Sequence, residues 1–323
     1  MSIFTKKKHT DATADPYRER YISVEEAKKL NEKNKKRDRK ADWRSTTFLI
    51  PSMVGVAVFF LIPFCIVIYY SFIDNPINKE FVWFENYVMV FKNLAFRKAA
   101  LNTAVFSVVA VPLAVLLSLA LALLLEMKIP FKSQLRSFFL SPLMVPTASV
   151  VLIWQVLFHN NGTVNSIIQF FGGNPVDWLN SDYAQVVIVL LFLWKNLGYN
   201  MILFMAALSS VPESLIEAAS LENANRWQIF WNVRAPYLVS TTLFVTIMSL
   251  INSFKVFREV YLLKGDYPYE TMYMLQHFMN NTFKSLDYQK MSTAAIIMAI
   301  VMVIIIGVLF KAEGVLGKDI EDE

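Results

Sequence analysis

Residues 211–238 read VPESLIEAASLENANRWQIFWNVRAPYL, a polar segment that separates two strongly apolar stretches of the chain. The Ser-x-x-Glu spacing of Ser210 and Glu213 predicts a capping box, in which side chains satisfy backbone amides at the start of a helix. Pro212 falls in the first turn, where its missing N–H leaves no hydrogen bond unmade. Asn223 falls where this helix must stop, because Asn is the next choice after Gly for the left-handed capping conformation. The segment therefore begins with a short helix that is bounded at both ends.

A second short helix is predicted from Arg226 to Val233. It should end before Ala235-Pro236, because the residue that precedes a proline is pushed out of the helical region. Two helices this short cannot bury all of the apolar side chains that they carry. These side chains are Leu215, Ile216, Ala218, Ala219 and Leu221 in the first helix and Trp227, Ile229, Phe230 and Trp231 in the second. The pattern therefore predicts a surface that needs a partner to cover it.

The same segment resembles the EAA motif of permease subunits in bacterial ATP-binding-cassette importers. The resemblance rests on Glu217-Ala218-Ala219, Asn223-Ala224, Phe230, Val233 and Pro236. In that family this loop is the coupling helix, which docks in a groove of the cytoplasmic ATPase subunit, so the matching residues are implied to make that contact. The usual Asp-Gly is replaced here by Glu222-Asn223, and Asn can take the same backbone conformation. Spacing alone, without the resemblance, would favour an ordinary amphipathic loop on the membrane surface.

The composition indicates an integral membrane protein of the all-α class. Hydrophobic residues make up 55% of the 323 residues and charged residues 18%, with a mean hydropathy of +0.42. About 20 apolar residues are needed to cross about 30 Å of hydrocarbon. Six segments are long enough to do so, which predicts six transmembrane helices. They are Thr46–Ile73, Leu101–Leu125, Phe138–Phe158, Tyr183–Ser209, Tyr237–Leu263 and Ser292–Phe310.

The distribution of Lys and Arg predicts that both ends of the chain are cytoplasmic. With that orientation, 21 of the 31 Lys and Arg residues lie in inside segments and 7 in outside segments. The expected organisation is a basic cytoplasmic tail over residues 1–45, a six-helix permease domain over 46–310 and a cytoplasmic tail over 311–323. The EAA-like loop of residues 210–236 then lies in the cytoplasm, between helices four and five. The hydrophilic first 45 residues predict no cleavable signal peptide, and they form either a solvated tail or a polybasic contact with lipid headgroups.

Enzymatic chemistry is not expected of this chain. The sequence contains no phosphate-binding pattern GxxxxGK[ST], so a partner must supply ATP hydrolysis. The three histidines, His9, His159 and His277, are far apart and show no metal-ligand spacing. Cys65 is the single cysteine, which excludes an intrachain disulfide. We predict no catalytic site, no metal and no cofactor, and we attribute the net charge of +5 to membrane orientation rather than to nucleic-acid binding.

Polar residues inside the fourth span predict a substrate path, because polar groups are expensive in a bilayer. Lys195 lies about 12 residues in from Tyr183, roughly 18 Å at a rise of about 1.5 Å per residue, which is near the midplane. It either donates a hydrogen bond to substrate or ties two helices together through a carbonyl or an acid. Gly198 suggests a local break in the helix. The candidate path residues of this span are Lys195, Asn196, Tyr199 and Asn200.

The third and fifth spans add further candidates. Ser249, Asn252 and Ser253 would suit a neutral, hydroxyl-rich ligand, although such residues also form hydrogen bonds between helices. Arg258 and Glu259 approach the outer interface, where we expect both to reach water. In the third span Thr147 is a candidate, with Gln155 farther along it, and nearby Pro142 and Pro146 should kink that helix.

The fifth span and its outer loop, SLINSFKVFREVYLLKGDYPYET, resemble the carbohydrate-importing branch of these permeases. The matching residues are Phe254, Phe257, Val260, Tyr261, Leu263, Gly265 and Pro268, whereas Lys264, Asp266 and Tyr267 depart from the pattern; Leu101-Asn102-Thr103 before the second span also fits the family. The resemblance covers about residues 46–310. It implies a multi-pass protein of the bacterial cell membrane that works with a second permease, two ATPase subunits and an extracytoplasmic binding protein for sugar. It also implies that Thr147, Ser249 and Ser253 line a mid-membrane sugar site.

Two alternatives to sugar import remain at this stage. The same importer could carry an amino acid, a peptide or an anion, and Lys195, Lys255 and Arg258 give that reading some weight. An ion-coupled secondary transporter or channel is less favoured, because the chain shows neither paired broken helices nor inverted repeats, and no intramembrane acid is expected for ion coupling.

Overall fold

The computed structural model describes residues 49–127 and 129–321, with side chains as far as Gly314. The basic tail predicted over residues 1–45 therefore lies outside the described residues. The chain divides into two compact units between Ile66 and Val67, and each is described by itself. Over the described ranges all regular elements are helical, and the β pairing there is limited to an isolated bridge between Ile73 and Phe81. The all-α prediction is confirmed.

Within residues 49–127 and 129–321, five helices are long and apolar enough to cross a membrane, and a sixth span would be formed by the bent pair α5–α6. The five are Leu49–Ser71, Leu94–Glu126, Ala184–Leu208, Arg226–Lys264 and Tyr288–Gly314. In chain order the elements are η1 (Ala57–Leu61), α2 (Ile62–Ser71), α3 (Glu85–Lys92), α4 (Leu94–Glu126), α5 (Lys132–Met144), α6 (Thr147–Leu157), α7 (Thr163–Phe170), α8 (Ala184–Leu208), α9 (Glu213–Leu221), α10 (Arg226–Ile229), η2 (Phe230–Arg234), α11 (Ala235–Lys255), α12 (Phe257–Lys264), η3 (Glu270–Met272), α13 (Leu275–Lys284) and α14 (Tyr288–Glu321).

The third predicted span is sharply bent. Helices α5 and α6 meet at an angle of 104°. Pro146 causes the bend, because it has no N–H to donate and it forces Val145 into an extended conformation with a ψ of 129°. Pro142 lies inside α5 without ending it. The predicted kink is therefore confirmed at Pro146 but not at Pro142.

The fourth span, α8, is a continuous helix, so the break predicted at Gly198 is wrong. Gly198 is instead the point at which α5 and α8 approach most tightly. A Cβ atom built on Gly198 would lie 1.9 Å from the carbonyl oxygen of Phe139 on α5. Glycine is required there because any side chain would collide with the backbone of the neighbouring helix.

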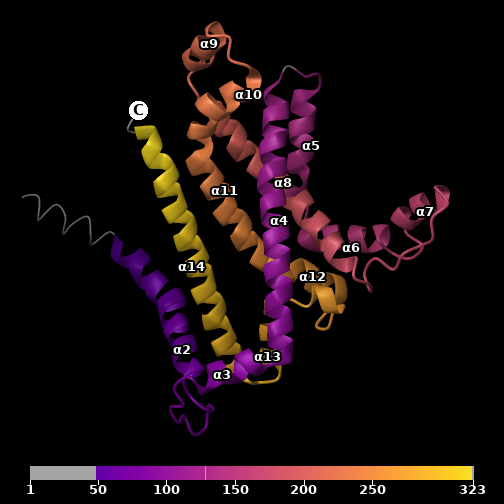
Figure 1. Cartoon of the computed structure of the whole chain (residues 1–323). Helices are drawn as coiled ribbons and strands as arrows, with labels where there is room; N and C mark the ends of the chain where they lie inside the picture. Colours follow the sequence, from indigo (N-terminus) through magenta and orange to yellow (C-terminus); the bar gives the residue numbers. More distant parts are fainter. Residues whose placement is uncertain (1–48, 128, 322–323) are drawn as a thin grey trace, which may run out of the picture. The chain divides into compact units, whose positions relative to one another are not determined.

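Small residues let α4 lie close to α8 and α11. Four of them recur every fourth position on one stripe of α4, and none is exposed: Ala110, Ala114, Ser118 and Ala122. A stripe of this kind brings two backbones together in a membrane, where apolar surface gives little drive for helices to associate. The large side chains Phe106, Phe192 and Phe204 fill the space on either side. The core of this unit therefore lies between α4, α8 and α11 (Figure 1).

The fifth span begins earlier than predicted, and the helix does not end before Pro236. The chain stays helical from Arg226 to Lys255. The π-helical turn η2 carries it past the proline, with the Ala235 N–H donating to the Phe230 carbonyl five residues back. This wider turn accommodates a ring that would clash with the preceding turn of an α-helix. A break at Val256 separates α11 from α12.

The second unit has two distinct ends (Figure 1). One end carries α9, α10, the connection between α4 and α5, and the C-terminal end of α14; the other carries α3, α12 and α13. We call the second of these the α13 end. The helix α14 runs on to Glu321, well past the predicted span limit of Phe310, so residues 311–321 continue a helix rather than start a new element.

Candidate functional site

The α9–α10 loop (residues 210–236) is a compact pair of short helices with an ordered turn between them. Asn223 adopts the left-handed conformation predicted for it, with a φ of 62°. The Ala224 N–H donates to the Ala219 carbonyl at 3.0 Å and the Asn223 N–H to the Ser220 carbonyl at 3.1 Å. These two bonds form a Schellman motif, which satisfies the last carbonyls of α9. The turn is therefore fixed by backbone hydrogen bonds that need a residue tolerant of positive φ.

The predicted capping box at the start of α9 is wrong. The Ser210 hydroxyl donates to the Ala207 carbonyl at 2.7 Å, so it ends α8 rather than beginning α9, and no side chain caps the N-terminus of α9. A capping box is present at the next helix instead. Asn225 Oδ1 accepts from the Gln228 N–H and Gln228 Oε1 accepts from the Asn225 N–H, both at 2.8 Å. The Asn-x-x-Gln spacing was a signal that sequence reasoning could have used.

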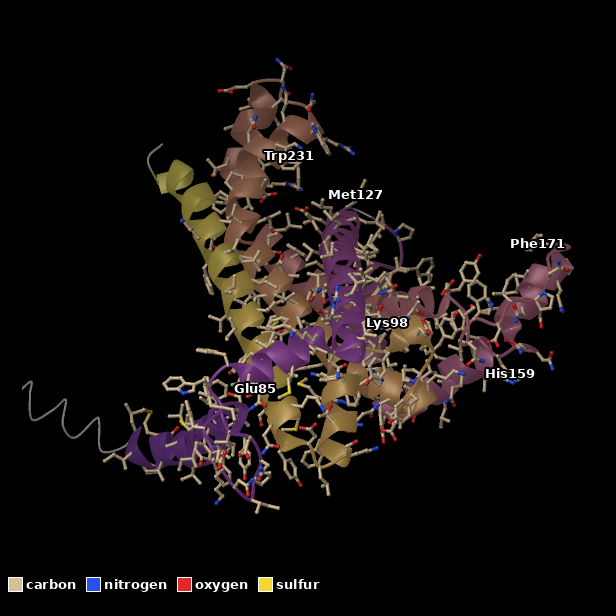
Figure 2. The ribbon with its side chains drawn as sticks, turned by 60° about the horizontal axis from the view of Figure 1, so that its bottom comes forward. Glu85, Lys98, Met127, His159, Phe171 and Trp231 are labelled. Carbon is tan, nitrogen blue, oxygen red and sulfur yellow. The ribbon has the colours of Figure 1, made fainter. Side chains whose placement is uncertain are left out.

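The apolar surface of the α9–α10 loop is uncovered in this chain. Leu221 is 85% exposed and Trp227 69%, and the rings of Trp227, Phe230 and Trp231 contact one another with centroids 5.2–6.2 Å apart. Glu217 is exposed and forms no ion pair with the side chains that the structure describes. Figure 2 shows Trp231 at the end of the unit opposite Glu85. An exposed group of large apolar side chains with a free carboxylate beside it is typical of a docking surface.

An ion pair joins the α9–α10 loop to the helix bundle. Arg234 Nη1 donates to Glu126 Oε2 at 2.7 Å, which links η2 to the last residue of α4. Both side chains are about two-thirds buried or more. Sequence reasoning missed this pair, since nothing in the spacing of residues 126 and 234 brings them together. A movement of the loop would therefore be transmitted to α4 as well as along α11.

A layer of hydrogen-bonded polar side chains lies within the bundle, and we call it the polar layer. Three bonds of 2.9 Å define it: Asn200 Nδ2 to Ser249 Oγ, Asn252 Nδ2 to Asn196 Oδ1, and one between the hydroxyls of Ser107 and Ser253. The structure thus brings together the polar residues predicted in the fourth and fifth spans. Ser107 of α4 is an addition that sequence reasoning missed.

The members of the polar layer differ in accessibility. Asn200, Ser249 and Ser253 are at most 1% exposed and use their polar atoms between helices. Asn196 and Asn252 are only partly buried. Tyr199, a predicted path residue outside the layer, is 38% exposed. Thr147 is partly exposed at the start of α6 and is not joined to this layer by any hydrogen bond between the described side chains. Only the accessible residues could touch a solute without a rearrangement of the helices.

Lys195 forms an ion pair with Glu259 of α12. Of the two roles open to Lys195, the structure shows the tie between helices through an acid. The prediction that Glu259 reaches water at the outer interface is wrong, because Glu259 is 8% exposed and points into the bundle. The expectation of no acid within the spans is wrong for the same reason. The partly buried cation and the buried anion stabilise each other, because an unpaired charge is costly in a medium of low dielectric.

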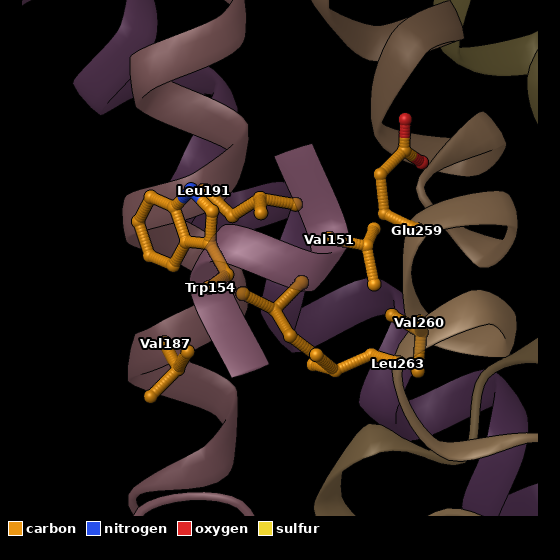
Figure 3. A pocket seen from close by; sticks show the side chains of 8 residues that line it. Val151, Trp154, Val187, Leu191, Glu259, Val260 and Leu263 are labelled. Atoms are coloured by element: carbon orange, nitrogen blue, oxygen red, sulfur yellow. The ribbon is translucent and has the colours of Figure 1, made fainter. Parts of the chain in front are cut away.

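A cavity of about 10 Å3 lies beside Glu259, lined by apolar side chains (Figure 3). This space is at the limit of what one water molecule occupies. The lining residues include Val151, Trp154, Val187, Leu191, Val260 and Leu263. The cavity is therefore a packing gap next to the ion pair and is too small for a solute.

At the α13 end, His277 supports the local fold. It is fully buried, and its Nδ1 accepts the Met274 N–H at 3.2 Å at the start of α13. Burial lowers the pKa of His277 to about 4, so the ring is neutral at pH 7. Hydrogen bonds to Asp266 and Tyr261 raise the pKa of Lys284 on the same helix. No group of three potential metal ligands occurs among the residues that were described.

Comparisons with known proteins agree on one family. Residues 114–312 match the family model described as "Binding-protein-dependent transport system inner membrane component". The chain is 29% identical over 285 residues to the arabinooligosaccharides transport system permease protein AraP of Bacillus subtilis (strain 168), covering 83% of this chain and 89% of that protein. It is also 29% identical over 282 residues to the multiple sugar-binding transport system permease protein MsmF of Streptococcus mutans, covering 85% of this chain and 95% of that one. A chain from the crystal structure of a bacterial ABC transporter involved in the import of alginate is similar in fold, with a TM-score of 0.76, 21% identity, and coverage of 86% and 97%.

Proposed function

Because this chain belongs to the family of inner membrane components of binding-protein-dependent transport systems, we propose that it is the permease subunit of an importer for a carbohydrate. The names of its relatives support a sugar or an oligosaccharide as the cargo. The importer would contain a second permease, different from this chain, together with two ATPase subunits and an extracytoplasmic binding protein. Family membership argues against an ion-coupled secondary transporter.

The uncovered α9–α10 loop is the observation that carries this proposal. We assign it the role of the coupling helix, which docks on an ATPase subunit through Glu217, Ala218, Ala219, Asn223 and Ala224. Exposed Trp227 and Leu221 offer the large apolar contacts that anchor most protein interfaces. Phe230 and Pro236 lie behind this surface, where they connect it to α11. A docked ATPase subunit would cover the apolar side chains of the loop that this chain by itself leaves exposed.

The orientation proposed here places the α9–α10 loop and both chain ends in the cytoplasm. The positive-inside rule supports it through the excess of Lys and Arg in the inside segments. The position of the C-terminal end of α14 on the same side as the loop supports it as well (Figure 1). The α13 end would then face the binding protein.

The proposed substrate path follows the accessible polar side chains. Asn196, Tyr199 and Asn252 would touch the solute, and Thr147 would join them from α6. Asn200, Ser249 and Ser253 would position these residues by fixing α8 and α11 relative to each other, and Lys195 would do so through Glu259. Amide and hydroxyl groups suit a sugar because they can donate and accept hydrogen bonds without carrying charge.

The mechanism proposed for the loop is mechanical. ATP binding closes the ATPase dimer and moves the docked loop, and the spans switch from an inward-facing to an outward-facing arrangement. Two connections would carry the movement: the helix that continues through η2 into α11, and the ion pair of Arg234 with Glu126. The loaded binding protein would then release its sugar into the opened path, and hydrolysis would reset the complex.

Reconstitution with the co-purifying subunits tests this proposal. The measurements are ATP-dependent uptake of a labelled pool of neutral oligosaccharides and ATP hydrolysis stimulated by the binding protein. We expect Glu217→Gln to lower both at least about tenfold, because charged contacts at an interface contribute on the order of 2 kcal/mol or more. Glu222→Gln, the same change at the far end of the same helix, is the matched control and should leave both close to wild type. Uptake in the absence of any ATPase subunit would refute the importer assignment.

A further inference from the structure

An open hollow of about 480 Å3 lies at the α13 end, and its lining is both basic and aromatic. The residues that line it are Lys255, Phe257, Arg258, Tyr261, Leu262 and Gln276. Its size falls within the range of pockets that hold small molecules. It is distinct from the small cavity beside Glu259, which lies on the other face of α12.

The two faces of α12 have opposite character. One face packs into the bundle through Val256, Glu259, Val260 and Leu263, all at most 8% exposed. The other face presents exposed Lys255 and Arg258 to the hollow. Since Glu259 is already paired with Lys195, it is directed away from these two cations.

Lys255 and Arg258 have no ion-pair partner among the side chains that the structure describes. The other lysines nearby do have partners: Lys284 pairs with Asp266 at 2.6 Å, and Lys264 donates to Asn180 Oδ1 at 2.7 Å. Asp266, in the connection that follows α12, is thus already paired with another cation. A lysine and an arginine that share one hollow without an anion between them repel each other, and an anionic group bound there would remove that repulsion.

Along the chain, the two cations lie between the proposed path residue Asn252 and the α13 end. Lys255 is the last residue of α11 and Arg258 lies in the first turn of α12, on either side of the break at Val256, and both line the same hollow. Lys255 lies about 30 Å along the helix from Ala235, at about 1.5 Å per residue, which is near the far edge of the hydrocarbon. A solute delivered at the α13 end would meet this hollow before it reached Asn252.

We propose that this hollow is an entry subsite for the carboxylate of an acidic sugar, such as a uronic acid residue of an oligosaccharide. The Arg258 guanidinium is suited to bind a carboxylate with two parallel hydrogen bonds, and Lys255 adds a second positive charge. Phe257 supplies an apolar ring against which the C–H face of a pyranose can pack; its centroid is 5.4 Å from that of Tyr261, over which Lys284 Nζ lies 5.2 Å from the centroid. Gln276 offers an amide for a ring hydroxyl. This inference rests on the proposed function and narrows its substrate class.

Equilibrium binding to the assembled importer in phosphatidylcholine nanodiscs tests the inference. The probes are a mixture of galacturonic and glucuronic acid disaccharides and the same mixture after chemical reduction of the carboxyl groups. Wild type should bind the acidic mixture at least about tenfold more tightly than the reduced one, the smallest effect usual for a hydrogen bond to a charged group. K255Q/R258Q should abolish the preference and leave binding of the reduced mixture unchanged. Lys264→Gln removes a charge of the same helix that does not line the hollow and that donates to Asn180, so it should preserve the preference.

Each other result overturns the inference. Equal affinity of wild type for the two mixtures, or a preference that survives in K255Q/R258Q, excludes the subsite. Loss of the second permease from the K255Q/R258Q complex would assign the cations to an acid of that subunit, and loss of added phosphatidylglycerol binding alone would assign them to lipid headgroups. Good binding of the reduced mixture alone, or failure to bind either mixture while the neutral oligosaccharide pool is still taken up, rejects only the acidic subsite. Failure to bind either mixture together with no uptake of that pool would reject the carbohydrate function itself.

Discussion

The α9–α10 loop and the polar layer have opposite relations to their surroundings. The loop leaves apolar side chains such as Trp227 and Leu221 exposed, whereas the layer buries polar ones such as Asn200 and Ser249. In water, an uncovered apolar group is typical of a surface that binds a partner. In a bilayer, a polar group must form a hydrogen bond or contact a solute. In both regions, exposure distinguishes the residues that can contact a partner or a solute from those that only support the fold. In the loop the exposed residues are apolar, whereas in the polar layer the accessible residues are polar.

The largest effect is expected when the ion pair of Lys195 and Glu259 is broken. A charged group inside the bundle needs a partner, as the polar groups of the polar layer do. Glu259→Gln would leave Lys195, whose side chain is 24% exposed, without its anion and should lower the free energy of unfolding of the complex by about 3 kcal/mol. The apolar double variant K195M/E259M should recover most of that loss. Thermal unfolding of the purified complexes measures both. A Glu259→Gln complex that melts like wild type would mean that Lys195 reaches water, which would break the comparison.

The next effect concerns the exposed aromatic side chains of the loop. Trp227→Ala should weaken association with the ATPase subunit by about 2 kcal/mol, because tryptophans at the centre of an interface are frequent hot spots. It should change the melting temperature of the isolated permease little, since Trp227 is 69% exposed there. Size-exclusion chromatography and calorimetry of the same preparation give the two readouts. If the isolated permease were destabilised and the association kept, the loop would be a structural element of this chain.

A smaller effect is expected where the loop turns. Asn223→Ala removes the short polar side chain that lets Asn adopt a φ of 62°, and it should lower stability and coupling by about 1 kcal/mol. Asn223→Gly should be neutral or slightly favourable, because glycine takes that conformation without strain. Comparing stimulated ATP hydrolysis in the two variants separates the effect of the backbone conformation at residue 223 from the effect of losing the Asn223 side chain. Equal loss in both would show that the amide of Asn223, not its conformation, makes the contact.

The smallest effect is expected inside the polar layer. A double-mutant cycle of Asn200→Ala and Ser249→Ala should give a coupling energy of about 0.6 kcal/mol, the average found for hydrogen bonds between membrane helices. Uptake should fall less in Asn200→Ala than in Asn252→Ala, because only Asn252 is accessible to a solute. The reverse order of uptake would place the substrate path on the other side of α8.

Local rules allowed much of the fold and of the loop to be predicted from sequence. Asn223 and Pro146 each dictate their own backbone conformation, so a turn and a bend could be foreseen at the correct residues. The lengths of the apolar segments gave the spans, with ends that shifted by several residues. The prediction that the helix ends before Pro236 was wrong, because a π-helical turn lets the helix continue past the proline. No single residue of the sequence indicates such a turn.

Contacts between distant residues could not be predicted in this way. The ion pairs Lys195–Glu259 and Arg234–Glu126 join residues that are 64 and 108 positions apart in the chain and that lie on different helices. Gly198 was predicted to break its own helix, whereas glycine is required there because the backbone of Phe139 on α5 lies so close. A polar residue in a span has the same local pattern whether it faces a solute or a neighbouring helix, and only packing distinguishes the two.

Disulfide or maleimide cross-linking tests the central claim, that the α9–α10 loop docks on an ATPase subunit, most directly. Cys65 is the single native cysteine, so Cys65→Ser gives a background without thiols. Leu221→Cys on the loop and Phe171→Cys at the tip beyond α7 are matched in exposure, at 85% and 81%, and Figure 2 shows Phe171 far from Trp231. We predict that Leu221→Cys alone forms a cross-link to a cysteine-substituted ATPase subunit in the assembled complex. A cross-link from Phe171→Cys but not from Leu221→Cys would contradict the account.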